Sequence, residues 1–262
     1  MPHLFLDVSD QIATIRLDNP PQNRLAEQMI GELEEALTTV GHSDARAVLL
    51  RAEGPDFSFG GDILPWDGMS NAALRSLFKR YMNAFNRFQR LPIHVVAAVQ
   101  GLCFGGGLEL ALRADVVFAA ESARFGHPEQ TLGIATMLSG IYRVAEKAGR
   151  LRAAEWAFTS EQVPAATMER FGVVNRVVPD VKLLEEASSF ALKMAKGPTR
   201  AHAAHKALLR TWAVGGVDTA DQALFDIAMP LFETEDAMAG LTSAIKAAKA
   251  GRARPVLEFK GC

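Results

Sequence analysis

Two glutamates stand in stretches of the chain that are otherwise almost free of charge. Glu109 lies between Leu108 and Leu110, and Glu129 directly precedes the uncharged stretch 130–142. Burial disfavours an ionised carboxylate and moves its pKa toward neutrality, which suits a side chain that gives and takes a proton. The hypothesis is therefore an acid–base pair. For Glu109, a structural ion pair with an arginine is the ordinary alternative.

Two glycine-bearing turns, each after a predicted strand, offer backbone amides for chemistry. The first reads FSFGGD at 57–62 and the second GLCFGGGLE at 101–109. Glycine lets the backbone approach a ligand closely. In the second turn the triple glycine runs into a helix start, where unpaired N–H groups can donate to a developing negative oxygen. The alternative is a tight turn that only packs helix against sheet.

Neither turn carries a phosphate-binding signature. No GK[ST] follows either of them, and the triple glycine at 105–107 does not give GxGxxG. Both a P-loop and a dinucleotide-binding fingerprint are therefore disfavoured. We do not expect the ligand to be held by its phosphates at these turns.

Hydrophobic periodicity predicts the elements that position these residues. A half-buried strand at 13–17 opens the fold and is followed by a surface helix from Ala26 to Gly41. Further predicted elements are a strand at 47–50, a helix at 74–88, and buried strands at 93–99 and 116–120, separated by the glycine turn and a helix. Strands that alternate with helices predict an α/β fold with a parallel sheet.

Beyond about residue 140 the pattern changes toward helix. Helices are predicted near 140–158, 182–196, 198–213, 218–232 and 235–250, with a strand at 173–178 between them. We therefore expect an α/β core over residues 1–200 and a helical region over residues 201–262.

Composition excludes several classes of protein. The chain of 262 residues is 49% apolar, and 28 basic against 30 acidic residues leave a net charge of −2. A disordered chain and a broadly basic nucleic-acid-binding protein are excluded on this ground. The two cysteines form no disulfide framework, and no signal peptide begins the chain, so we expect a cytoplasmic protein.

The longest uncharged stretch, 91–108, is nearly long enough to cross a bilayer. Pro92, His94, Gln100 and the triple glycine would break or polarise such a helix, whereas a buried strand followed by a glycine turn accommodates them. We expect no membrane partner.

Four stretches, in order and spacing, resemble the crotonase (enoyl-CoA hydratase/isomerase) superfamily over nearly the whole chain. They are LDNPPQN (17–23), FSFGGDI (57–63), GLCFGGGLELALRAD (101–115) and ARFGHPEQTLGI (123–134). The resemblance implies a spiral of ββα repeats with a helical C-terminal trimerisation region, assembled as a homotrimer or a dimer of trimers. Phe225, Met229, Leu231 and Phe232 are candidates for the subunit contacts, unless they fold back on their own subunit.

The resemblance also implies a substrate and a mechanism. The substrate is a coenzyme A thioester, and no metal or redox cofactor is expected. The backbone amides of Gly61 and Gly106 form an oxyanion hole for the thioester carbonyl, where glycine leaves the main-chain donors unobstructed. Glu109 helps to activate a water and Glu129 exchanges the proton at the α-carbon of a 2-enoyl-CoA. The alternatives are an isomerase that uses Glu129 alone, and a non-catalytic acyl-CoA-binding protein.

The chain departs from the family pattern just after the second glutamate. Hydratases of the family read LLGxxPGxGG there, whereas this chain has Thr136 in place of the proline and Met137 in place of a glycine that lies beside the catalytic water. A methionine at that position crowds the water site or moves the backbone. A pocket shaped for a particular acyl group is the alternative interpretation. The candidate substrate-binding residues are Phe59, Asp62, Ile63, Trp66, Met137, Arg24 and Arg252.

The C-terminal tail is locally basic, although the chain as a whole is nearly neutral. From Lys246 to Cys262 five basic residues stand against Glu258 alone. By resemblance, Arg252 meets the 3′-phosphate of coenzyme A, and Arg24 is the second candidate for this contact. The alternative is a solvated tail.

Overall fold

The computed structural model describes all 262 residues and is built around a six-stranded sheet. In spatial order its strands are β1 (Leu4–Ser9), β2 (Ile12–Leu17), β3 (Ala47–Ala52), β4 (His94–Val99), β6 (Val116–Ala120) and β9 (Arg176–Val178). From β2 to β9 all neighbours pair in parallel. The predicted parallel sheet is confirmed. Its central strands β3 and β4 are almost wholly buried, as expected for strands covered on both faces.

The N-terminal edge of the sheet corrects one expectation. The strand predicted at 13–17 does not open the fold, because β1 precedes it and pairs with it antiparallel, Leu4 opposite Leu17. The chain turns between the two strands at Asp10 and Gln11, both with positive φ.

Helices α1 (Glu27–His42) and α2 (Asn71–Gln89) pack against each other, and α1 also packs on β1. Helix α7 (Leu183–Ala195) packs on β3 and β4. Helix α1 continues one residue past the expected end at Gly41, since its cap forms only where Ser43 N–H donates to Val40 O.

A second, three-stranded sheet was not predicted. It consists of β5 (Leu102–Phe104), β7 (Arg124–Gly126) and β8 (Val163–Pro164). Strands β5 and β7 are parallel, so their C-terminal ends lie at the same edge. Helix α3 (Gly106–Ala111) follows β5 and the 3₁₀ helix η2 (Pro128–Leu132) follows β7. The small sheet thereby brings the stretches of Glu109 and Glu129 together.

Glycines divide the helical half of the chain at two places, one that the sequence prediction missed and one that it contained. The helix expected at 140–158 is two helices, α4 (Gly140–Ala148) and α5 (Arg150–Thr159), because Gly149 has a φ of 83°. The two helices expected at 198–213 and 218–232 are confirmed: α8 (Thr199–Ala228) consists of two helical segments separated by a kink at Gly216, whose φ is 76°. The strand expected at 173–178 is reduced to β9, and α6 (Ala165–Arg170) precedes it.

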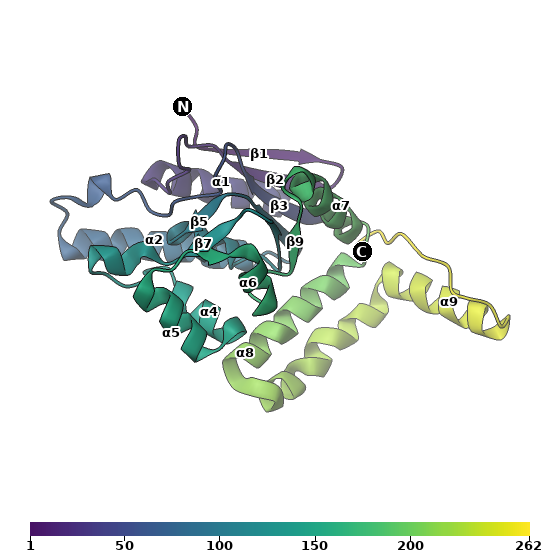
Figure 1. The fold of residues 1–262 in the computed structure, drawn as a ribbon. Helices are drawn as coiled ribbons and strands as arrows, with labels where there is room; N and C mark the ends of the chain where they lie inside the picture. Colours follow the sequence, from purple (N-terminus) through teal and green to yellow (C-terminus); the bar gives the residue numbers. More distant parts are fainter.

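The C-terminal helices α8 and α9 (Glu235–Lys249) extend away from the sheet body (Figure 1), and the 3₁₀ helix η4 (Met229–Glu233) connects them. The chain end then returns beside α7 (Figure 1), where Phe259 N–H donates to Lys196 O at 3.0 Å. Helix α8 begins next to the expected domain boundary at 200, but the division itself stays a prediction. No helix combines the length and the apolar character needed to cross a membrane.

Candidate active site

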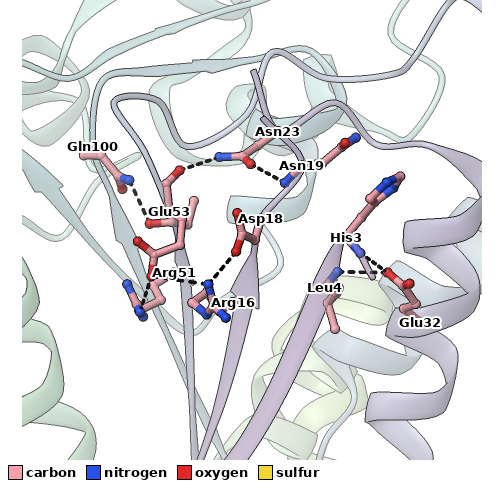
Figure 2. A network of polar contacts seen from close by, with 11 residues as sticks. His3, Leu4, Arg16, Asp18, Asn19, Asn23, Glu32, Arg51, Glu53 and Gln100 are labelled. Carbon is pink, nitrogen blue, oxygen red and sulfur yellow. Dashed lines mark hydrogen bonds and ion pairs between the residues drawn. The ribbon is translucent and has the colours of Figure 1, made fainter. Parts of the chain in front are cut away.

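The first glycine turn is held in place by Asn23, a buried residue with a φ of 47°. Its Nδ2 donates to Glu53 O at 2.8 Å and to Asp56 O at 2.9 Å, and its Oδ1 accepts from Asn19 N–H at 2.8 Å. Figure 2 shows the Asn23 side chain between Asn19 and Glu53, the residue that follows β3. Satisfied buried polar groups of this kind fix local geometry. The chain therefore enters the 57–62 turn from a fixed position.

The two glycine turns pack backbone against backbone. Ser58 Oγ donates to Asn23 O and accepts from Gly60 N–H. A Cβ atom on Gly60, whose φ is 89°, would lie 2.9 Å from Gly106 N, and one on Gly107 would lie 2.7 Å from Ser58 Cβ. The glycines therefore do allow close packing, as the alternative interpretation of a tight packing turn required. It is also what brings the two turns to one place.

The amides of Gly61 and Gly106 are adjacent and free. A Cβ on Gly106 would lie 3.5 Å from Gly61 N, and neither N–H donates a hydrogen bond within the protein. Both residues line a cavity of about 350 Å³. Two unpaired N–H groups on one cavity have the arrangement of donors that stabilises a developing oxyanion.

Glu109 lies at the inner wall of this cavity and is only 2% exposed. Its Oε1 accepts from Leu138 N–H at 2.8 Å and from Gly140 N–H at 2.7 Å. Burial raises its pKa to about 7; the charge of Glu129 also raises it, while the two backbone hydrogen bonds oppose the shift. The ion pair considered as its alternative is absent, because the buried Arg113 donates to Leu138 O and Ser139 Oγ.

Glu129 also lines the cavity. Its side chain is 13% exposed, its Oε2 has no hydrogen-bond partner, and burial raises its pKa. A Cβ on Gly105 would lie 3.1 Å from Glu129 Oε1, so the carboxyl lies directly over the second glycine turn. The structure thus gathers both predicted glutamates and both predicted amides around one cavity.

The predicted substrate-binding residues divide between the cavity and the rest of the molecule. Phe59, Ile63, Trp66, Met137 and Arg24 line it. Asp62 does not, because its Oδ1 accepts from Leu64 N–H at the start of the 3₁₀ helix η1 (Leu64–Trp66). Arg252 does not line the cavity either. It follows α9, which lies on the opposite side of the molecule from α2 (Figure 1), and α2 contributes Phe78 and Tyr81 to the cavity lining.

Sequence reasoning missed several residues of the site. The remaining lining is mostly apolar and comprises Leu25, Phe78, Tyr81, Phe104, Gly105, Pro128, Thr131, Leu132, Ile134 and Leu138. His127 stands behind the lining, 2% exposed, and its Nδ1 lies 3.8 Å from Glu129 Oε2. Its place two residues before a predicted proton carrier was the available signal. For the apolar wall there was none, since such side chains are indistinguishable from core.

Comparisons with known proteins identify the family and the fold of the chain. Over 203 residues the chain is 37% identical to a (7aS)-7a-methyl-1,5-dioxo-2,3,5,6,7,7a-hexahydro-1H-indene-carboxyl-CoA hydrolase of Mycobacterium tuberculosis, covering 76% of this chain and 80% of the relative. It is 30% identical to a probable enoyl-CoA hydratase of Rhizobium meliloti, covering 94% and 96%. The crystal structure of an enoyl-CoA hydratase from Bacillus anthracis superposes with a TM-score of 0.88 at 28% identity, over 99% of this chain and 100% of that one. The fold is therefore the crotonase fold with a C-terminal helical region. The family model for enoyl-CoA hydratase/isomerase matches residues 7–243, and the chain belongs to that family.

Proposed function

We propose that the protein adds water across the double bond of a 2-enoyl-CoA thioester, or removes it in the reverse direction. The observation that carries this proposal is the meeting of two unpaired amides, Gly61 and Gly106, with two carboxyls, the buried Glu109 and the partly buried Glu129, on one cavity. The two amides can stabilise negative charge, and the two carboxyls can move protons; the reaction needs both.

In the proposed reaction the thioester oxygen accepts hydrogen bonds from the Gly61 and Gly106 N–H groups. Negative charge grows on this oxygen when the β-carbon is attacked. Preorganised donors then stabilise the transition state by about 3–4 kcal/mol each. Because amides hold the charge and carboxyls move the protons, the proposed hydration needs neither a metal ion nor a redox cofactor.

The two glutamates take different parts. With its pKa near 7, Glu109 is partly ionised at neutral pH and accepts a proton from the attacking water. Its Oε1 is held by two backbone N–H groups, so Oε2 is the oxygen left to meet the water. Glu129, on the other side of the glycine turn, gives its proton to the α-carbon while the hydroxyl bonds to the β-carbon.

The test is hydration of 2-enoyl-CoA thioesters of increasing chain length, followed by the loss of ultraviolet absorbance of the conjugated thioester. Glu109→Gln and Glu129→Gln should each lower kcat by about 10²–10⁴-fold and leave binding of butyryl-CoA, measured by calorimetry, within a few-fold. Absence of hydration across the panel, or full activity in Glu109→Gln, would contradict the proposal.

Hydrolysis of a cyclic acyl-CoA is the second candidate. The relative named as a hydrolase of an indene-carboxyl-CoA is more similar to this chain than the probable enoyl-CoA hydratase of Rhizobium meliloti, 37% against 30% identity. Met137 also lines the cavity where family hydratases have glycine. In that reaction Glu109 would take a proton from the water, the water oxygen would add to a carbonyl carbon of the acyl group, one bond of that carbon would break, and Glu129 would give a proton to the leaving atom. Mass spectrometry separates the two reactions when ring-containing and straight-chain acyl-CoA thioesters are compared as substrates.

Two other outcomes are distinguished by the same assays. An isomerase that relies on Glu129 alone would convert a 3-enoyl-CoA to the 2-enoyl-CoA and would keep this activity in Glu109→Gln. A non-catalytic acyl-CoA-binding protein would bind butyryl-CoA but show no turnover with any thioester.

A further inference from the structure

Three buried polar atoms without partners meet behind the cavity. They are both ring nitrogens of His127 and Oε2 of Glu129. Unsatisfied buried polar atoms are costly and rare in folded proteins, and three in one place point to an interaction that tightens when the site is used. His127 Nδ1 lies 3.8 Å from Glu129 Oε2.

Packing fixes where the imidazole lies. A Cβ on Gly140 would be 2.5 Å from His127 Cε1 and 2.9 Å from Glu109 Cγ, so the ring fills the space that the glycine leaves open. The backbone holds the residue as well, because Ser160 Oγ donates to His127 O at 2.9 Å. The ring does not line the cavity. It therefore acts on substrate only through a neighbour.

The groups around the His127 ring determine which of its two nitrogens carries the proton. Burial lowers the pKa of His127 to about 4, so the ring is neutral at physiological pH. A neutral imidazole carries one N–H. Placing it on Nδ1 directs the donor at the Glu129 carboxyl, whereas placing it on Nε2 leaves a buried donor with no acceptor. The Nδ1–H tautomer is therefore favoured.

We propose that His127 is a positioning residue for Glu129, donating a hydrogen bond from Nδ1–H to Oε2 of the ionised carboxylate. This inference rests on the proposed role of Glu129 as a proton carrier. A closure of about 0.8 Å brings the pair into the N–H···O range, and catalytic hydrogen bonds are often long before substrate binds.

The chemical consequence follows from the sign of the interaction. A donor to the charged form favours ionisation and lowers a carboxyl pKa, in opposition to burial. The other titratable group beside the ring is Glu109 of α3; its charge disfavours a second ionised carboxyl. His127 thus keeps Glu129 able to release its proton to the α-carbon instead of retaining it.

The test uses a pair of variants that match in shape. Asn and Leu both branch at Cγ, but only Asn carries an N–H close to the position of Nδ1. Carbon-13 NMR of glutamate-labelled enzyme, with resonances assigned through Glu129→Gln and Glu109→Gln, measures the titration of Glu129 without any turnover. In His127→Leu we expect Glu129 to titrate at a pH about 1 higher than in the wild type, a tenfold change in proton affinity. His127→Asn should restore most of the difference.

A second measurement needs no variant. Nitrogen-15 NMR of the wild-type imidazole should show a protonated Nδ1 and an unprotonated Nε2. The proposal is overturned by an unprotonated Nδ1, or by a Glu129 titration that is the same in His127→Leu and the wild type.

Kinetics separate this inference from the proposed function. If hydration is observed, His127→Leu should lower kcat with crotonyl-CoA by about tenfold or more while KM stays within about twofold, and His127→Asn should recover most of kcat. If no thioester is turned over, the proposed reaction fails, but the carboxyl titration still decides whether His127 acts on Glu129.

Discussion

At the scale of single residues, the site is built by taking carboxyls out of water. Glu109 has neither a salt bridge nor an exposed oxygen at its bound end, and its two backbone donors offset burial only in part. The residue is therefore a place where the fold gives up stability at neutral pH for a group that can exchange protons.

Replacing Glu109 with glutamine should change how stability depends on pH. In the folded protein its pKa is raised from an ordinary 4.5 to about 7. The stabilising contribution is therefore complete below pH 4.5 and is lost as pH rises to 7 and above, in total on the order of 3 kcal/mol. Between pH 5 and 8, Glu109→Gln should gain stability relative to the wild type, measured by urea unfolding. Glu186→Gln, on an exposed part of α7, should keep the wild-type pH dependence.

Gly140 is the smallest residue at the most crowded point of the site. An added Cβ would meet His127 Cε1 at 2.5 Å and Glu109 Cγ at 2.9 Å, so Gly140→Ala must displace one or both side chains. We expect the variant to lose about 1–3 kcal/mol of stability and most of its activity, by unfolding and kinetics. Gly41→Ala in α1, where nothing lies within 4 Å, should be neutral or slightly stabilising. Equal behaviour of the two variants would show that the crowding has no effect.

At the scale of elements, one buried arginine shapes the turn that holds Glu109. Arg113, two residues after the end of α3, donates to Leu138 O at 2.9 Å, to Ser139 Oγ at 2.7 Å and to Asn86 Oδ1 at 2.6 Å. Ser139 has a φ of 82°. With the carbonyl of Leu138 turned to the arginine, the N–H groups of Leu138 and Gly140 point to the glutamate.

Removing this arginine should therefore damage both the fold and the proton transfer. Arg113→Met removes the donor to Asn86 Oδ1 of α2 and a donor to both Leu138 O and Ser139 Oγ, at a cost of about 1–3 kcal/mol, and frees the 138–140 turn. We expect a lower midpoint of urea unfolding and, under conditions where the variant is folded, a larger loss in kcat than in KM. Arg113→Lys keeps the charge but lacks the forked donor geometry. Wild-type kcat in the folded methionine variant would show that the turn does not depend on Arg113.

The elements also show what the sequence could and could not predict. Strands β3, β4 and β6 are predictable because a continuous apolar run bounded by turn residues has few other folds available. The short strands β5, β7 and β8 are not, since two or three residues carry no period and are stabilised only by one another. The glycine turns and the glutamates can be predicted from the sequence, because their residue types and spacing are distinctive. The roles of Asn23 and Arg113 depend on contacts between segments distant in sequence, which a single chain does not display.

At the scale of the whole molecule, the C-terminal helices leave apolar side chains uncovered. Phe225 is 68% and Phe232 58% exposed, and the exposed set continues with Trp212, Met229, Met238, Leu241 and Ile245. The chain does not fold these phenylalanines back on itself. An apolar surface of this kind on helices that extend from the body (Figure 1) favours an interface between subunits.

We therefore predict that the protein assembles as a trimer or a dimer of trimers through α8, η4 and α9. Light scattering should give a mass of three or six chains of 28.3 kDa. In Phe225→Glu with Phe232→Glu, charges replace two side chains that the interface would bury, so the variant should dissociate while its sheet body stays folded by circular dichroism. Val181→Glu, at a position 93% exposed on the body, should leave the mass unchanged. A monomeric wild type would contradict the assembly.

In a single chain Arg252 stands in solvent at the end of α9. If the protein is a monomer, Arg252→Ala should therefore leave coenzyme A affinity unchanged at low and high salt.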